Sequence, residues 1–368
     1  MPRAKSKVTA KRKSRAPAKS KSPAKRKARK QGQGLFKRFL PVVLFIGITW
    51  ALFAPITEFV SAQGFFKPKI APEPGEDESE VVTRVQIYLD RKQFGPGVID
   101  GALGEFTRLA VSAYNTRYVK KPDPNNWYQV LRDSQLGIKY VYTKYTIKKG
   151  DLRYVGRVPR KLAQQEGMKY MYYRSLAEFV TERYHTNWKF LHKLNPGVNL
   201  DRLKPGDILS VPNVVPFQIE DIKNHDQYPE EALLSQRHLL VNTTTKIVSI
   251  LENDQVIATF PITPGKEKFI PRGEWKIINM VATPEFRYDR KMLNEGVRSD
   301  HYYTIPPGPN NPVGILWAGL SKSGIGLHGT NNPDTIGRAR SAGCIRLANW
   351  DAIRLPTLVR PGATVTVK

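Results

Sequence analysis

The sequence predicts a multidomain α+β protein whose C-terminal part is a mostly antiparallel β sandwich. The chain has 368 residues, more than a single hydrophobic core usually supports, so two or more domains are expected. A charge-free apolar run near the N-terminus has the length of one membrane-spanning helix. After it, helix-period patterns give way, from about residue 231, to alternating strand patterns punctuated by proline and glycine. The expected order is one transmembrane helix, a small helical module, an α+β module and the β domain.

The first 38 residues are expected to form a basic, disordered, cytoplasmic tail. The chain holds 59 Lys and Arg against 32 Asp and Glu, a net charge of +27, and residues 1–38 contain sixteen of the bases and no acid. Such a segment has too few apolar side chains to build a core. Its lysines would attract nucleic-acid phosphates without sequence preference. Anionic lipid explains the same residues more simply, so nucleic acid is not an expected partner.

Residues 39–60 are expected to anchor the chain in a membrane. FLPVVLFIGITWALFAPIT, at 39–57, runs nineteen positions without a charge, close to the roughly twenty that a helix needs to cross a bilayer. The basic flank keeps the tail in the cytoplasm and puts everything after the helix outside. A cleaved signal peptide is the alternative, because Val60 and Ala62 match a small-residue cleavage site. Residues 61–80, which include APEPGEDESE, are expected to be an acidic, solvated linker.

Residues 81–140 are expected to form a small helical domain. Apolar side chains recur at helical spacing from Val82 to Leu89, FGPG at 94–97 interrupts the pattern, and the pattern then resumes. Between the two helices, DGALGEFT at 100–107 resembles the Asp-Gly-x-x-Gly-x-x-Thr loop of the peptidoglycan-binding-like three-helix domain. Any helical hairpin with a glycine turn is the alternative.

Residues 141–214 are expected to form a second, α+β module. YTIKKGD at 145–151 and LNPGVNLDRLKPGDILSVPN at 194–213 resemble the two ends of a lysin motif, a two-strand, two-helix module that in its family binds N-acetylglucosamine-containing glycans. Ser175 is a candidate cap of its first helix. Residues 152–174 are an insertion relative to that family. The fold can tolerate a surface insertion, because the entropic cost of closing a loop grows slowly with its length. The insertion leaves from the strand end near which glycan binding is expected, so it puts glycan binding in question.

Residues 231–368 carry strand signals. KIVSILENDQVIATFPI at 246–262 sets two β-branched runs around the polar turn ENDQ, as a hairpin would. GEWKIINMV and the C-terminal ATVTVK add alternating segments. We expect a mostly antiparallel β sandwich or barrel with one or two short helices, such as one from Ala348 to Pro356.

Cys344 is the single cysteine of the chain, so no internal disulfide can form. By itself it is either a reactive thiol or a buried small hydrophobe. A thiol attacks as the thiolate, so a nucleophilic cysteine needs a base, and His328 could take its proton and later return it to a leaving amine. Gly329 and Gly343 flank the two residues and would let backbone amides approach a developing oxyanion.

The order of these residues resembles the catalytic domain of the L,D-transpeptidase family. HGT at 328–330 and SAGCIRL at 341–347 are similar to its histidine-glycine pair and its Ser-x-Gly-Cys-x-Arg stretch. The likeness continues upstream in IPPGPNNPVG at 305–314 and TPGKEKFIPRGEWKI at 263–277. Ala342 stands where many members have histidine. Papain-like endopeptidases are disfavoured because their cysteine precedes the histidine.

The resemblance implies peptidoglycan cross-linking. Cys344 would attack the third residue of a tetrapeptide stem, release D-alanine and pass the acyl group to another stem's side-chain amine, giving a 3,3 cross-link. His328 would act as base and then acid, oriented by the backbone carbonyl of Gly329. Ser341 would join the glycines in the orienting and oxyanion group. Arg346 would organise the cysteine loop or bind a substrate carboxylate.

Two alternatives stay open. An L,D-carboxypeptidase would pass the same acyl enzyme to water, and a non-catalytic protein would tether the membrane to peptidoglycan through residues 81–214. The expected partners are peptidoglycan stem peptides, glycan strands and the bacterial inner membrane, with the folded domains on the periplasmic side. No metal or cofactor is expected, because no pair of His, Asp or Cys has ligand spacing and no phosphate loop occurs. We expect residues 81–214 to hold the enzyme on its polymer more than they shape its chemistry.

Overall fold

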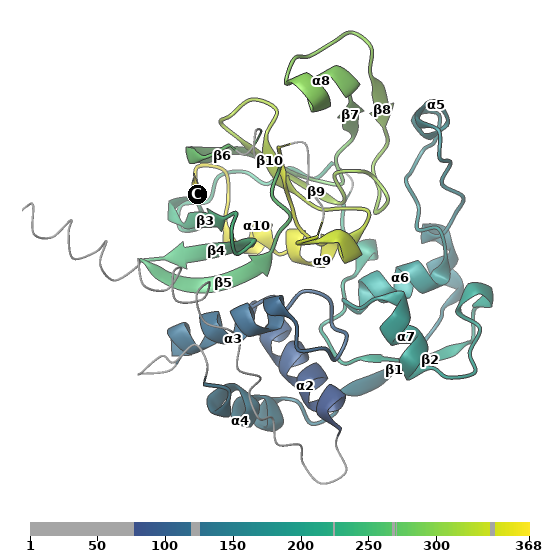
Figure 1. Cartoon of the computed structure of the whole chain (residues 1–368). Coiled ribbons are helices and arrows are strands. Elements are labelled where there is room, and N and C mark those ends of the chain that lie inside the picture. The colour runs from purple at the N-terminus through teal and green to yellow at the C-terminus, as the bar shows by residue number, and fades with distance from the viewer. Residues whose placement is uncertain (1–76, 119–125, 224, 267–268, 270, 339–342) are drawn as a thin grey trace, which may run out of the picture. The chain divides into compact units, whose positions relative to one another are not determined.

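The computed structural model describes residues 77–118, 126–223, 225–266, 269, 271–338 and 343–368 (Figure 1). The expected tail (1–38), the expected anchor (39–60) and most of the expected linker lie outside the described residues. Within the described ranges, no helix is both long enough and apolar enough to cross a membrane. The described residues belong to one compact unit.

A helical part comes first along the chain. Asp77 caps its first helix, because its carboxylate accepts a hydrogen bond from the amide of Glu80 at 2.7 Å. The buried Gln86 of this helix binds the DGALGEFT loop, since its Oε1 accepts from the amide of Gly101 at 3.0 Å. Gly101 has φ +69° and lies against the first helix, so the predicted glycine turn has a steric reason. The helices are α2 (Glu78–Arg91), α3 (Glu105–Tyr118) and α4 (Tyr128–Gly137).

An α+β part follows, and its elements occur in the predicted strand-helix-helix-strand order. Strands β1 (Tyr142–Thr146) and β2 (Ile208–Pro212) pair antiparallel. Between them lie helices α6 (Leu176–Arg183) and α7 (Trp188–Leu194). Ser175 caps α6 as predicted, with its hydroxyl accepting from the amide of Glu178 at 3.1 Å. Assignment of this part to the lysin motif, and its glycan binding, stay predictions.

The insertion at 152–174 is not the free surface loop that the sequence suggested. It contains part of the 3₁₀ helix η1 (Lys149–Tyr154) and helix α5 (Leu162–Glu166). Its backbone then contacts the β domain, because the Met171 amide donates to Pro307 O at 2.7 Å and Met171 O accepts from the Asn310 amide at 3.0 Å. The insertion therefore joins two parts of the molecule.

The C-terminal domain is built on a single eight-stranded sheet, where the sequence predicted a mostly antiparallel sandwich or barrel. The strand order is β11-β10-β9-β6-β12-β3-β4-β5, and a separate two-stranded sheet joins β7 to β8. The sheet is mostly antiparallel, but β10 pairs parallel with β11 and β12 pairs parallel with β3. The strands are β3 (His238–Asn242), β4 (Ile247–Glu252), β5 (Gln255–Pro261), β6 (Gly273–Ala282), β7 (Phe286–Tyr288), β8 (Tyr303–Ile305), β9 (Leu316–Leu320), β10 (Gly326–His328), β11 (Ile345–Arg346) and β12 (Thr364–Val367).

The difference from a sandwich lies in how the strands pair. Alternating patterns predict which side chains face a core, but they do not say which strand lies beside which. Here the C-terminal strand β12 inserts between β3 and β6, so two groups of strands become one sheet. The predicted hairpin at 246–262 is present as β4 and β5, and its turn residues Asn253 and Asp254 both have positive φ, as a type I′ turn requires.

The helix predicted from Ala348 to Pro356 is divided in two. The structure has α9 (Asn349–Ala352) and α10 (Leu355–Leu358), with Pro356 in the first turn of α10. Proline has no amide hydrogen to donate into a preceding turn, so it begins the second helix and does not continue the first.

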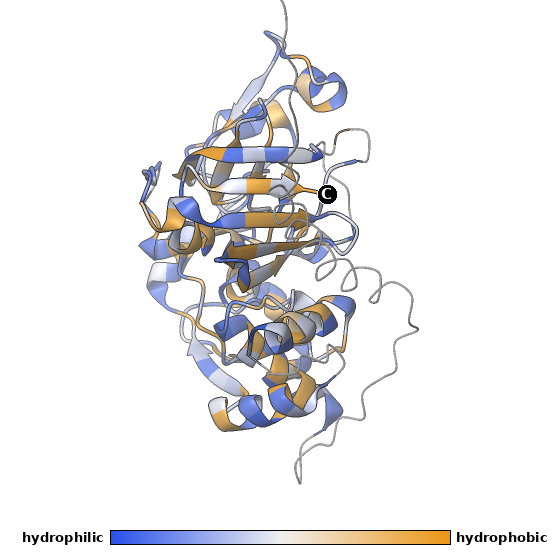
Figure 2. Cartoon of the chain, turned by 90° about the vertical axis from the view of Figure 1, so that its left-hand side faces the viewer, coloured by the Kyte–Doolittle hydropathy of each residue, from blue (hydrophilic) through white to orange (hydrophobic). Residues whose placement is uncertain are grey.

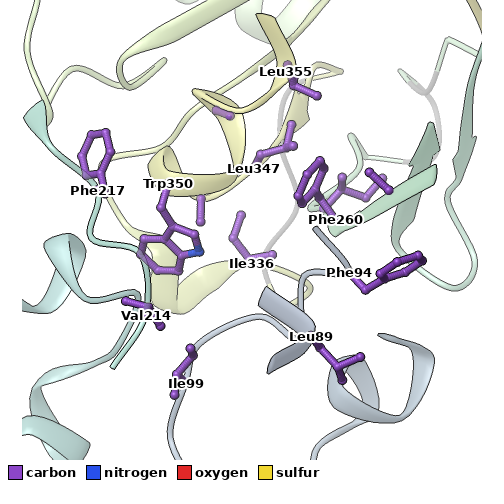
Figure 3. Close-up of a cluster of buried hydrophobic side chains, with 14 of the residues drawn as sticks. Leu89, Phe94, Ile99, Val214, Phe217, Phe260, Ile336, Leu347, Trp350 and Leu355 are labelled. Carbon is purple, nitrogen blue, oxygen red and sulfur yellow. The ribbon is translucent and has the colours of Figure 1, made fainter. Parts of the chain in front are cut away.

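One hydrophobic core runs through all three parts (Figure 3). The buried indole of Trp350 lies at this junction. In Figure 2, hydrophobic positions concentrate along strands of the large sheet and alternate with polar positions along the helices. The core residues labelled in Figure 3 are Leu89, Phe94 and Ile99 of the helical part, Val214 and Phe217 after β2, and Phe260, Ile336, Leu347, Trp350 and Leu355 of the β domain.

Buried polar contacts also join the parts. Arg354 of the β domain donates to both carboxylate oxygens of Asp90 in α2, at 2.9 and 3.0 Å. His185 after α6 contacts the same carboxylate at 3.1 Å and stacks on Trp350. Burial favours the neutral acid, but Arg354 and His185 hold the pKa of Asp90 well below its ordinary value. The three parts thus meet around one ionised carboxylate.

Candidate active site

The sheet positions His328 at the end of β10. Its register neighbours are Trp317 on β9 and Arg346 on β11. The imidazole is buried and stacks on Trp317, with ring centroids 5.8 Å apart. Its Nδ1 lies 2.6 Å from the carbonyl oxygen of Gly329. A carbonyl can only accept, so Nδ1 carries the hydrogen and Nε2 remains available to take a proton. Gly329 O is the carbonyl that the family resemblance implied as the orienting partner.

The surroundings keep this imidazole neutral. Burial, together with the nearby guanidinium of Arg346, lowers the pKa of His328 from 6.5 to about 4. The backbone of Gly329 and of Val313 opposes the shift by favouring the protonated ring, but it does not overcome burial. At neutral pH the side chain is therefore a base with its lone pair on Nε2.

Cys344 immediately precedes β11 and lines the same cavity as His328. The residue as a whole is half-buried, and its Sγ lies 3.6 Å from the carbonyl oxygen of Gly324. Burial raises the pKa of the thiol above 9.0, while the backbone of Gly326 and the charge of Arg346 work in the opposite direction. The resting thiol is thus protonated, and any attack by Cys344 requires a base at that moment.

The glycines beside these residues are needed for close approach. Gly343 has φ +129°, and a Cβ there would meet the Ile325 side chain at 3.0 Å. A Cβ on Gly265 would come within 2.6 Å of Gly343 Cα, so the segment around Gly265 presses directly on the cysteine loop. A Cβ on Gly329 would meet Asn349 Oδ1 at 2.2 Å. Only glycine fits these positions without displacing neighbours.

Arg346 is held in the sheet by its backbone and turns its side chain toward the cavity. Its amide donates to Thr263 O at 3.0 Å, and its carbonyl accepts from the Thr263 amide at 2.9 Å. The guanidinium lines the cavity, and its buried Nε has no hydrogen-bond partner among the described residues. Ser341, the remaining predicted site residue, lies outside the described residues.

The cavity has a volume of about 820 Å³, and much of its wall comes from a segment that carried no recognised motif. This segment comprises β7, helix α8 (Arg290–Glu295) and the residues up to Arg298. Arg287, Arg298 and Lys322 add cationic side chains to that of Arg346, while Glu285 and Asp289 add acidic ones. Arg287 pairs with Asp289 at 3.3 Å. Asp289 is already engaged, since it caps α8 and accepts from the Ser299 amide at 2.7 Å.

The surplus of cationic side chains suits a ligand that carries carboxylates. In the sequence, this segment is a long stretch between predicted strands that mixes basic and aromatic residues. Such a composition is equally typical of a solvated loop, so it does not identify a cavity wall. Among the described residues, no group of three or more His, Cys, Asp or Glu could hold a metal ion.

Comparison with known proteins finds a family match in the C-terminal domain. Residues 236–367 match the family model of the L,D-transpeptidase catalytic domain, YkuD. A Bacillus licheniformis protein provisionally named L,D-transpeptidase YkuD is 29% identical over 191 residues, which cover 52% of this chain and 92% of that protein. Its Bacillus subtilis namesake is 35% identical over 130 residues, covering 35% of this chain and 65% of the relative.

An Enterococcus faecium L,D-transpeptidase variant shares 18% identity with a TM-score of 0.28, and the match covers 36% of this chain and 50% of that one. The chain thus spans about half the length of that structure. His328, Cys344 and the residues that line their cavity lie inside the range that the family model matches, except for His225.

Proposed function

We propose that this chain, whose residues 236–367 form an L,D-transpeptidase catalytic domain of the YkuD family, is a peptidoglycan transpeptidase that works through an acyl enzyme on Cys344. The observation that carries the proposal is the pairing of a protonated thiol with a neutral, oriented imidazole in one cavity. Each residue rests in the form that a general-base mechanism needs.

The chemistry begins as the Cys344 thiol approaches the carbonyl carbon of the third stem residue. Nε2 of His328 takes the thiol proton, the S–C bond forms, and an oxyanion develops. The intermediate collapses by breaking the amide bond, and His328 returns the proton to the departing amine of D-alanine. Because both resting groups are uncharged, charge separates only during attack, where the nearby cation of Arg346 favours the developing thiolate.

In the second half of the reaction, the acyl group passes from Cys344 to an acceptor amine. The side-chain amine of another stem's third residue loses a proton to His328 and attacks the thioester carbon. The C–S bond breaks, Cys344 recovers a proton, and a 3,3 cross-link is released. The cationic side chains of Arg298 and Lys322, which line the cavity, would hold the carboxylates of the stems during both halves.

The test is to incubate the full-length chain with purified disaccharide tetrapeptides and to identify products by mass. Cross-linked dimers together with free D-alanine are expected. Tripeptides without dimers would point to an L,D-carboxypeptidase. No product and no thioester on Cys344 would contradict catalysis and leave a tethering protein.

A further inference from the structure

We propose that Glu182 of the α+β part is a positioning residue for the proposed active site, because it holds Asn349, and Asn349 holds the backbone beside His328. The inference rests on the proposed function, in which His328 is the base. It assigns residues 141–214 a part in the chemistry, where the sequence suggested attachment to the polymer.

Asn349 lies against the histidine loop on its buried side. Its side chain has no exposed surface, and its Oδ1 accepts from the amides of Thr330 at 3.1 Å and Ile315 at 3.2 Å. A Cβ on Gly314 or Gly329 would meet this oxygen at 2.1 or 2.2 Å. The position of one amide oxygen therefore determines the path of two backbone segments.

This matters for His328 because both segments contact its ring. Gly329 supplies the carbonyl that accepts from Nδ1, and it lies between His328 and the Thr330 amide that Asn349 binds. Val313, whose backbone also interacts with the imidazole, lies two residues before Ile315. A displaced Asn349 would shift the acceptor that orients the base.

Glu182 helps to determine how Asn349 is oriented. An asparagine side chain can turn over and exchange its oxygen and nitrogen, so its neighbours decide which end faces where. Nδ2 donates to Glu182 Oε1 at 3.0 Å and to Pro309 O at 3.3 Å, which leaves Oδ1 for the loop amides. The hydroxyl of Tyr173 donates to the same Oε1 at 2.7 Å and holds the carboxyl in place.

A second contact from the same part reaches the same region of the β domain. Asn310 Nδ2 donates to Tyr172 O at 2.7 Å and to Glu178 Oε1 at 2.9 Å. Gly308 has φ +134°, and a Cβ there would meet Met171 O at 2.5 Å. The 307–310 segment, which leads to Val313, is therefore clamped by the insertion, while Glu182 acts through Asn349 a few residues away.

Burying the Glu182 carboxyl costs folding free energy, which is hard to explain if the residue only holds the α+β part against the β domain. Glu182 is buried, and burial raises its pKa to about 8. A carboxyl in such a place lowers stability relative to well-packed apolar side chains, so it is expected where a defined geometry is needed. Here that geometry is the orientation of Asn349.

The experiment compares three variants of the full-length chain. Glu182→Met keeps the length of the side chain but removes the acceptor for Asn349, whereas Glu182→Gln keeps an oxygen at the same place. Thr186→Val is the matched control, because it removes a buried 2.6 Å hydrogen bond from the same part to Ile99 O of the helical part and leaves the hydrogen bonds of Asn349 in place. Turnover, melting temperature and the pKa of His328 by NMR on isotope-labelled histidine are measured for each.

Glu182→Met is expected to lower kcat by about ten- to a hundredfold, with KM changed less than about threefold, as for a misplaced catalytic group. The pKa of His328 should rise from about 4 toward 6.5 as its surroundings loosen. Glu182→Gln should restore both values. Thr186→Val should lower the melting temperature and leave kcat and the pKa of His328 unchanged. Glu182→Ala is the second variant if the methionine change prevents folding.

Two results would overturn the inference. One is an unchanged kcat and His328 pKa in Glu182→Met, even at a lower melting temperature. The other is an equal loss in Thr186→Val, because that would reflect stability alone. Failure of the proposed function is a separate result, in which the wild-type chain has no turnover. The His328 pKa of the variants decides the positioning role even then.

Discussion

At the scale of single residues, the uncharged resting pair sets the pH dependence. His328 must be unprotonated to act as a base, and its pKa in the folded chain is lowered from 6.5 to about 4. Acylation of Cys344 should therefore stay near its maximum from neutral pH down to about pH 5 and fall only below that. The measurement is the rate of acyl-enzyme formation against pH, by mass spectrometry of the quenched protein. A half-maximal rate near pH 6.5 would show an ordinary, solvated imidazole instead.

Substitution of Cys344 and His328 tests whether they take part in the chemistry or only pack in the core. Cys344→Ala should abolish acylation, and Cys344→Ser should leave a far less acidic nucleophile that imidazole activates poorly. His328→Ala should slow acylation by about a hundredfold to ten-thousandfold, the usual range for general acid-base catalysis. The family resemblance implies that carbapenems acylate the same thiol, so intact mass after drug treatment is the measurement. If Cys344 only packs the core, Cys344→Ala should instead lower the melting temperature while labelling persists.

The steric need for glycine beside the histidine can also be tested. Gly329→Ala should destabilise the domain by about 1–3 kcal/mol, because the added carbon would overlap Asn349 Oδ1 and force it to move. Gly104→Ala is the matched control, since a Cβ there meets nothing within 4 Å. Urea unfolding curves of both variants give the comparison. Equal stabilities would mean that the Asn349 side chain moves aside at little cost.

At the scale of elements, helix α6 carries the buried carboxyl of Glu182, whose burial costs less free energy when it is protonated. Burial raises the pKa of Glu182 from 4.5 to about 8 in the folded chain. Between those values the folded state binds more protons than the unfolded state, so this residue's contribution to stability falls as pH rises. Glu182→Gln, which is always neutral, should raise the melting temperature more at pH 8.5 than at pH 5. A constant difference between the two pH values would contradict the shift.

Asp351 in α9 shifts in the same direction, since burial raises its pKa to about 7. It remains in the Glu182→Gln chain, so some pH dependence of stability should persist there. The lowered pKa of His328 acts in the opposite sense. Between about pH 6.5 and 4 the unfolded chain takes up a proton at this histidine that the folded chain does not, so acid destabilises the fold through it.

At the scale of the whole molecule, the shared core predicts that the β domain depends on the residues before it. Trp350, Phe260 and Leu347 are buried against side chains of the helical and α+β parts. A chain of residues 231–368 alone would expose this apolar surface. We expect it to bind hydrophobic dye, to aggregate and to lack the unfolding transition of the full chain. The same melting temperature as the full chain would mean that the parts are independent domains.

The expected cellular location of the molecule is inferred from residues outside the described ranges. We propose that residues 39–60 are a retained anchor, with the tail cytoplasmic and the folded parts periplasmic, supported by the apolar run and the basic flank before it. Sequencing the N-terminus of the mature protein from membranes should return the start of the tail. A mature start at Gln63 would instead identify a cleaved signal peptide.

Local patterns in the sequence were enough to predict several helices and strands, because these patterns depend on side chains that lie within one or two turns of each other. The hairpin at 246–262, the Ser175 cap and the helices of residues 81–140 are such cases. The candidate pair His328 and Cys344 could also be identified, since two short motifs carry both residues.

Only the tertiary structure decided what surrounds that pair. Three features depend on contacts between distant segments, which the local spacing of side chains does not predict. They are the position of β12 inside one sheet, the cavity wall from β7 to Arg298 and the core shared by three parts. Glu182 and Asn349 are 167 positions apart in the chain. Their contact, and the burial that makes His328 a neutral base, arise from packing between distant segments, and burial acts on pKa only once those segments have come together.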